Sequence, residues 1–158
     1  MDSDRLNRWL TLVANVAVIA GIVFLGLELR QNTEMMRAQS RTEMSQGAIQ
    51  LMTLNVNDKT YVDTMWRGFL GEELDIVEKE QLHRTLAAWT QYWNNIAYLH
   101  KAGLYDDGEF DLQMNVVRDE LQYLPGWKAH WCENRQWNAS ETLIEAIEGG
   151  MDGEFCEE

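Results

Sequence analysis

The chain has 158 residues, 46% of them hydrophobic, and a formal net charge of −13 at pH 7. The charge falls entirely on one part of the chain, because residues 1–56 carry five basic and five acidic side chains whereas residues 57–158 carry eight and twenty-one. An acidic domain of this kind repels phosphate backbones, which argues against direct nucleic-acid binding. The length suits one domain with an appendage, and the single proline favours long helices.

The first predicted element is an apolar helix at residues 10–27, LTLVANVAVIAGIVFLGL, which contains no charge. Such a helix would be about 27 Å long, close to the hydrocarbon thickness of about 30 Å. Trp9 precedes it, where an interfacial aromatic side chain belongs. A cleaved signal peptide would have a shorter apolar run followed by a small-residue cleavage site, which the stretch after Leu27 does not offer. Residues 1–29 are therefore predicted to be a tail and an uncleaved membrane anchor.

Basic residues on the two sides of this anchor indicate its orientation. Arg5 and Arg8 precede the apolar run, and Arg30, Arg37 and Arg41 follow it. Positively charged flanks stay on the cytoplasmic side. The count of three against two favours a cytoplasmic C-terminal domain by a single charge.

The anchor is predicted to continue without a break into a polar helical extension over residues 30–56. Counting in sevens from Ala14 gives a seam of small or apolar residues that runs through both parts. Within the membrane this seam would allow close approach of another helix, and beyond it two further residues would extend the contact. The candidate interface residues are Ala14, Asn15, Ala17 and Gly21 in the anchor, and Met35 and Ala38 in the extension. The alternative is one long helix that docks on its own domain.

The remaining elements are all predicted to be helices, so the fold class is all-α. Asp75 and Glu78 have the spacing of a capping box and begin the longest of them. Apolar residues recur every three or four positions within each helix, as expected for a bundle. The predicted helices cover residues 59–70, 75–102 and 108–124, a short stretch around Trp127 and Trp131, and residues 141–147. Residues 57–148 would form the acidic helical domain, and residues 149–158 a flexible acidic tail.

Two clusters invite a functional interpretation within this domain. Glu80 and His83 form a Glu-x-x-His pair, half of a di-iron site, but neither other histidine has the matching glutamate three residues earlier. No catalytic triad and no phosphate-binding loop is legible, so we expect neither enzymatic activity nor a cofactor. Trp89, Trp93 and His100 lie on one helix face and could line a pocket for an apolar ligand or lipid, although aromatic residues at this spacing also suit a core.

The two cysteines, Cys132 and Cys156, fit no metal-binding spacing and no CxxC motif. They could pair if the domain faces an oxidising compartment. Because the last residues are expected to be mobile, two unconnected, reduced thiols are the expectation.

The short N-terminus, the single anchor and the following ELRQNTEMMRAQ resemble a large group of uncharacterised bacterial single-pass membrane proteins, in which an RQN tract directly follows the span. Here that tract is Arg30-Gln31-Asn32. The stretch from Tyr92 to Trp131, YWNNIAYLHKAGLYDDGEFD through LPGWKAHW, is similar to the helical domain of the same group. The resemblance implies an anchor in the bacterial inner membrane and a small helical domain. It implies no catalytic residues.

These observations lead to one functional expectation and one alternative. We expect a membrane-anchored, non-catalytic assembly, accessory or scaffold protein that contacts the lipid bilayer and acts by self-association or by binding another membrane-protein complex. The alternative is a membrane-tethered domain that binds a ligand or lipid beside Trp89, Trp93 and His100.

Overall fold

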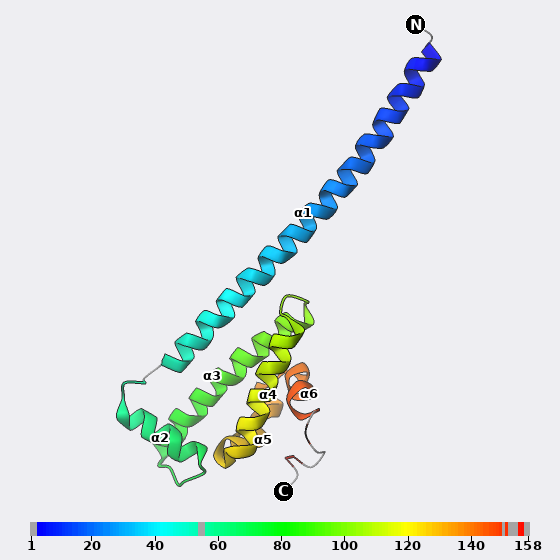
Figure 1. The fold of residues 1–158 in the computed structure, drawn as a ribbon. Coiled ribbons are helices and arrows are strands. Elements are labelled where there is room, and N and C mark those ends of the chain that lie inside the picture. The colour runs from blue at the N-terminus through cyan, green and yellow to red at the C-terminus, as the bar shows by residue number, and fades with distance from the viewer. Residues whose placement is uncertain (1–2, 54–55, 150, 152–154, 157–158) are drawn as a thin grey trace. The chain divides into compact units, whose positions relative to one another are not determined.

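The computed structural model describes residues 3–53, 56–149, 151 and 155–156, and the all-α prediction is confirmed. The described residues form six helices and no strand (Figure 1). The chain divides into two compact units, residues 1–39 and 40–158. The helices are α1 (Ser3–Thr53), α2 (Lys59–Phe69), α3 (Ile76–Lys101), α4 (Asp107–Tyr123), α5 (Pro125–Asn138) and α6 (Glu141–Glu148).

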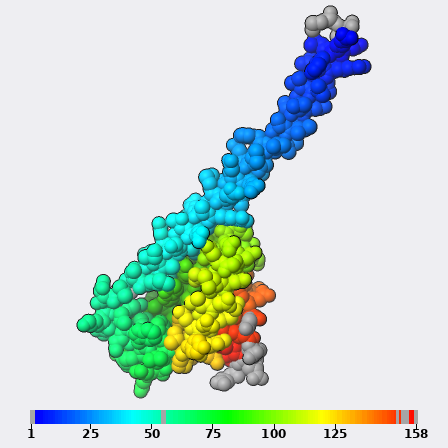
Figure 2. Space-filling model, viewed as in Figure 1, coloured from blue at the N-terminus to red at the C-terminus, as the bar shows by residue number. Residues whose placement is uncertain are grey.

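The first unit is the N-terminal part of α1. Its apolar run at residues 10–27 has no buried residue, and it is long and apolar enough to cross a membrane. Two threonine hydroxyls in this unit bond within the helix: Thr11 donates to the Asn7 carbonyl at 2.9 Å, and Thr33 donates to the Leu29 carbonyl at 2.9 Å. Its large apolar side chains are all more than half exposed, which suits a surrounding of lipid; Figure 2 draws this stretch in blue.

The second unit begins inside α1, at Ser40, which is buried. Met44 packs against the hydrophobic core, and the ring of Tyr92 lies 3.7 Å from the position that a Cβ on Gly47 would take. Arg41 forms an ion pair with Glu109 at the start of α4. Residues 40–53 therefore belong to the helical domain rather than to a separate extension. The described helix runs to Thr53, and residues 54 and 55, close to the predicted end of the extension at residue 56, lie outside the described residues.

Side-chain caps begin four of the other helices. Asp58 accepts backbone N–H groups at the start of α2, Asp106 does so for α4, and Ser140 does so for α6. At α3 the predicted capping box is confirmed, since Asp75 accepts from the Glu78 amide while the Glu78 side chain accepts from the Asp75 amide. Each cap satisfies donors that the first helical turn leaves open and stabilises its helix by about 1 kcal/mol.

The core of the domain is built around α3, which packs against α2, α4, α5 and α6. The apolar stripe predicted for α4 is buried, and the stripe of α3 contributes its central residues. The buried core residues from α3 to α6 are Leu86, Trp93, Ile96, Ala97, Phe110, Met114, Val117, Leu121, Trp127, Trp131, Leu143 and Ile147.

The Pro125–Gly126 pair starts a helix as well as ending one. Pro125 occupies the first turn of α5, where its missing N–H costs nothing. Gly126 lies against the end of α2, so that a Cβ there would stand 1.8 Å from the carbonyl oxygen of Gly68. Only glycine permits α5 and α2 to approach this closely.

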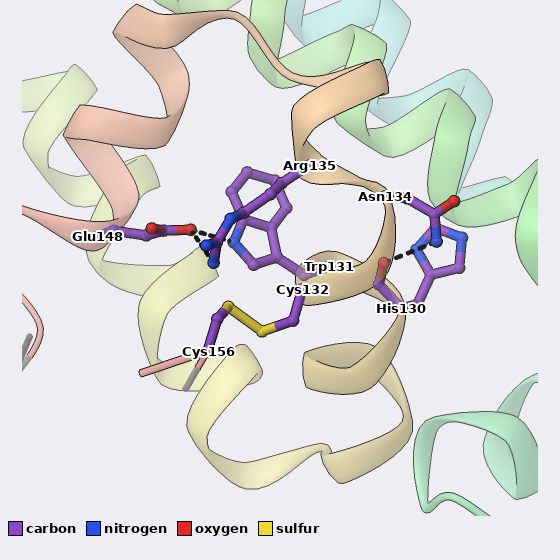
Figure 3. The surroundings of a disulfide bond; sticks show 7 residues. All are labelled: His130, Trp131, Cys132, Asn134, Arg135, Glu148 and Cys156. Atoms are coloured by element: carbon purple, nitrogen blue, oxygen red, sulfur yellow. Dashed lines mark hydrogen bonds and ion pairs between the residues drawn. A yellow bond between two sulfur atoms is a disulfide. The ribbon is translucent and has the colours of Figure 1, made fainter. Parts of the chain in front are cut away.

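The described residues of the C-terminal segment differ from the expectation. Met151, Phe155 and Cys156 pack against the core, and Cys156 forms a disulfide with Cys132 of α5 (Figure 3). The expected pair of reduced, unconnected thiols is therefore wrong for this structure, because docking of the segment brings the two cysteines together. The rest of the predicted flexible tail, at residues 150, 152–154 and 157–158, lies outside the described residues.

Candidate functional site

The candidate membrane interface lies on one side of α1. Since successive residues turn by about 100°, Ala14, Ala17 and Gly21 fall within about 60° of the helix circumference, whereas Asn15 lies about 100° from Ala14 and outside this face. All four residues are exposed. A Cβ built on Gly21 would meet nothing within 4 Å, so this face is open in the part of the chain that the structure describes. It has the small side chains that let a second helix approach closely in a membrane.

The candidate interface of the extension is also at the surface. The side chain of Met35 is 65% exposed, and Ala38 is exposed as well. On another side of the helix, Arg30 and Glu34, four residues apart, form an ion pair at 3.1 Å between Nε and Oε1. This exposed pair supports the helix by only a few tenths of a kcal/mol.

The aromatic side chains predicted to line a pocket form a stacked column instead. Trp93 is 4% exposed and lies between Trp89 and Trp127, with ring centroids 5.7 and 5.4 Å away and interplanar angles of 27° and 21°. Phe69 of α2 continues the column on Trp127 at 5.6 Å. Trp93 is thus part of the core, where stacking ties α2, α3 and α5 together.

His100 lies away from this column, seven residues or about 10 Å further along α3. Its ring stacks on Phe110 of α4 at a centroid distance of 3.9 Å, and its Nε2 lies 3.0 Å from a carboxylate oxygen of Asp107. This arrangement fastens the C-terminal end of α3 to the start of α4. It gives His100 a packing partner rather than a place beside the tryptophans.

A groove does lie beside Trp89. It has a volume of about 170 Å³ and is formed by the end of α1 together with α2 and α3. Met52 and Trp66, which are 65% and 57% exposed, lie at this groove, and its walls are mainly apolar. The hydroxyls of Tyr61 and Thr85 lie 2.9 Å apart and bond to each other. Trp93 and His100 are not among the lining residues, and the volume is below the roughly 300 Å³ of typical ligand pockets.

The structure pairs two histidines whose contact no sequence pattern indicates. His83 of α3 and His130 of α5 are half-buried, and Nδ1 of the first lies 2.9 Å from Nε2 of the second. Burial, with a smaller contribution from the charge on His83, lowers the pKa of His130 to about 4. At neutral pH the pair is therefore held by one neutral imidazole hydrogen-bonding to the other, which joins α3 to α5.

The His83–His130 pair has no third ligand for a metal ion among the described residues. Glu80, the other half of the Glu-x-x-His motif, is exposed and forms an ion pair with Arg84 at 2.7 Å. Among the described residues no group of three or more His, Cys, Asp or Glu side chains is placed to hold a metal ion.

A further polar cluster joins α2 to α3. Arg67 donates to Glu78 Oε1 at 2.8 Å and to the Glu73 carbonyl at 2.7 Å. Hydrogen bonds from the Asp75 amide and from Arg67 lower the pKa of the Glu78 carboxyl. The same carboxylate thus caps α3 and anchors α2, which is a structural role.

The fold and these sites define a class: an all-α helical domain that carries one exposed apolar helix of membrane-spanning length. No family model, no curated protein and no solved structure matches the chain, so a more particular identity has to be argued from its own residues.

Proposed function

We propose that this protein is a non-catalytic assembly or accessory protein, anchored in a membrane, which acts by self-association or by binding another membrane-protein complex. The observation that carries the proposal is the exposed small-residue face of α1, formed by Ala14, Ala17 and Gly21 within an apolar stretch that has no buried residue. Lipid covers large apolar side chains well, whereas a face of small residues gains most from a second helix.

Asn15 adds a polar group to the apolar stretch, on a different side of the helix from Ala14, Ala17 and Gly21. A side-chain amide in hydrocarbon is costly to leave without a hydrogen-bonding partner, and a neighbouring helix can supply one. Beyond the membrane, Met35 extends the contact surface with a flexible, exposed apolar side chain. The non-catalytic part of the proposal rests on the sequence, which contains no legible catalytic motif.

The location that fits this function is the bacterial inner membrane, with residues 10–27 as a single span. The apolar run supports the span, and the resemblance of the juxtamembrane tract supports the bacterial setting. The count of flanking arginines favours a cytoplasmic domain by one charge, and the disulfide argues for the opposite side, as developed below.

The test is the oligomeric state of the full chain purified in mild detergent, measured by native mass spectrometry and by chemical crosslinking in membranes. We expect a homo-oligomer or a copurifying membrane protein, and we expect Gly21→Leu to dissociate it. Gly26→Leu is the matched control, because a Cβ at Gly26 also meets nothing within 4 Å while this glycine lies about 140° around the helix from Gly21. A strictly monomeric protein with no partner, unchanged by Gly21→Leu, would refute the proposal.

The groove beside Trp89 supports a second candidate, a membrane-tethered domain that binds an apolar ligand or lipid. Native mass spectrometry of the detergent-purified chain should then show a bound small molecule that is lost in Trp66→Ala. Trp137→Ala is the control, because Trp137 is also exposed but does not line the groove. Absence of any bound mass in the wild-type protein would remove this candidate.

A further inference from the structure

We infer that the helical domain resides in an oxidising compartment, on the side of the membrane away from the cytoplasm, where the disulfide between Cys132 and Cys156 holds the C-terminal segment on α5. This inference rests on the membrane anchorage in the proposed function and is independent of self-association. It also locates the partners of the helical domain on that side of the membrane.

The pairing of the two cysteines is the first observation. They are the only cysteines in the chain, they are 24 residues apart, and both are half-buried. Their Cα atoms are 5.4 Å apart, which is the separation that disulfides prefer. The link joins α5 to the segment after α6, so it closes a loop around the last helix of the bundle.

Near the disulfide, other contacts hold the segment and the end of α6 on α5. Lys128 places its ammonium group 4.9 Å from the centre of the Phe155 ring. Arg135 forms an ion pair with Glu148 at 3.0 Å, and Trp131 donates its indole N–H to the same carboxylate at 2.8 Å (Figure 3).

These contacts come from one side of α5. Lys128, Cys132 and Arg135 have the spacing i, i+4 and i+7, so they lie along the same helix face. On that face Arg135 contacts Glu148 at the end of α6, Lys128 contacts Phe155, and Cys132 is bonded to Cys156. Because the cysteine pair belongs to a continuous contact surface, the disulfide is a structural element of the fold and not an accidental meeting of two mobile thiols.

The chemistry of the link selects the compartment. Two thiols lose two protons and two electrons when the S–S bond forms, and the electrons reduce a disulfide of a thiol oxidoreductase through a mixed-disulfide intermediate. Bacterial compartments outside the cytoplasm maintain such an oxidant, whereas glutathione and thioredoxin keep cytoplasmic thiols reduced. A structural disulfide is therefore typical of a domain that has crossed the membrane.

The flanking charges are compatible with this orientation. The charge rule acts through short loops, and domains as long as residues 40–158 cross the membrane largely regardless of their charge. Ion pairs reduce the effective charge of the basic flank after the span, as between Arg30 and Glu34 and between Arg41 and Glu109. Arg5 and Arg8, close to the start of the span, then keep the N-terminus in the cytoplasm.

The first test measures the state of the thiols in cells that express the full chain. After acid quenching and denaturation, a maleimide-polyethylene glycol reagent should add nothing to the wild-type protein before reduction and two adducts after it. Cys132→Ser should take one adduct without reduction, which shows that the reagent reaches Cys156. Two adducts on the unreduced wild-type protein would overturn the inference.

The second test measures the side of the membrane. A protease added to intact spheroplasts should degrade the helical domain, and the same protease added to inverted membrane vesicles should leave it protected. Protection in spheroplasts would overturn the inference. Extraction with alkaline carbonate separates this result from the proposed function, because release of the chain would overturn the anchorage alone and leave the thiol result standing.

Discussion

Residues 1–39 and residues 40–158 use the same kind of side chains in opposite ways. In the first unit Val18 and Ile22 are 61% and 64% exposed, whereas in the second Leu86 and Ile96 are fully buried. The second unit covers its apolar surface with its own helices, and the first needs cover from outside the described part of the chain. The helical domain therefore carries the fold, while the proposed function assigns the exposed apolar surface of the first unit to lipid and to another helix.

The largest expected effect is a difference in stability between two variants that carry the same Ile→Ala substitution, one in each unit. Ile96→Ala removes a fully buried side chain and leaves a cavity, so the free energy of unfolding should fall by about 2–5 kcal/mol. Ile22→Ala should change it by less than about 0.5 kcal/mol, because Ile22 is exposed. Urea denaturation in detergent, followed by tryptophan fluorescence, measures both. Equal losses for the two variants would break the comparison.

Reduction of the disulfide should destabilise only the second unit. Opening a link between residues 24 apart restores chain entropy to the unfolded state, so the free energy of unfolding should fall by about 2–4 kcal/mol. Denaturation with and without a phosphine reductant measures the change. The control is Cys132→Ser, on which the reductant should have no effect.

Two glycines sharpen the same contrast. Gly126→Ala forces α5 away from the Gly68 carbonyl, and we expect a loss of about 1–3 kcal/mol. Gly26→Ala, where a Cβ meets nothing within 4 Å, should leave the helical domain unchanged and should slightly favour α1. Thermal denaturation followed by circular dichroism compares them, and a neutral Gly126→Ala would mean that the helices do not approach this closely.

The smallest expected effect is a pH dependence confined to the second unit, which contains all three histidines. The folded-state pKa of His130 is lowered to about 4, below its unfolded value near 6.5. Between pH 4 and 6.5, His130 therefore binds a proton in the unfolded chain but not in the folded one. The stability that His130 contributes is complete above pH 6.5 and is lost as the pH falls towards 4.

Because His130 is only half-buried, we expect this loss to be about 1–2 kcal/mol. His130→Gln should flatten the fall between pH 6.5 and 4, while His100→Gln should not, and urea denaturation at several pH values measures the difference. An identical pH profile for the wild type and His130→Gln would contradict the assigned burial of this imidazole.

Much of the fold could be predicted from local patterns. The capping box at Asp75 and Glu78 and the four-residue spacing of Arg30 and Glu34 each involve neighbours within about one helical turn, and the structure contains both. The candidate sites could be predicted less well from the sequence. Trp89 lines a groove that Trp93 and His100 do not line, and the packing of Trp93 in the core and of His100 on Phe110 depends on which helices pack together.

Sequence patterns alone locate the helices, define the all-α class and identify residues 10–27 as an apolar helix long enough to span a membrane. The contacts of His83 with His130 and of Cys132 with Cys156, and the start of the domain inside α1, follow from the tertiary packing. The reason is physical. Helix formation depends on residues within a few positions of one another, whereas pairs 47 and 24 residues apart depend on how whole helices pack.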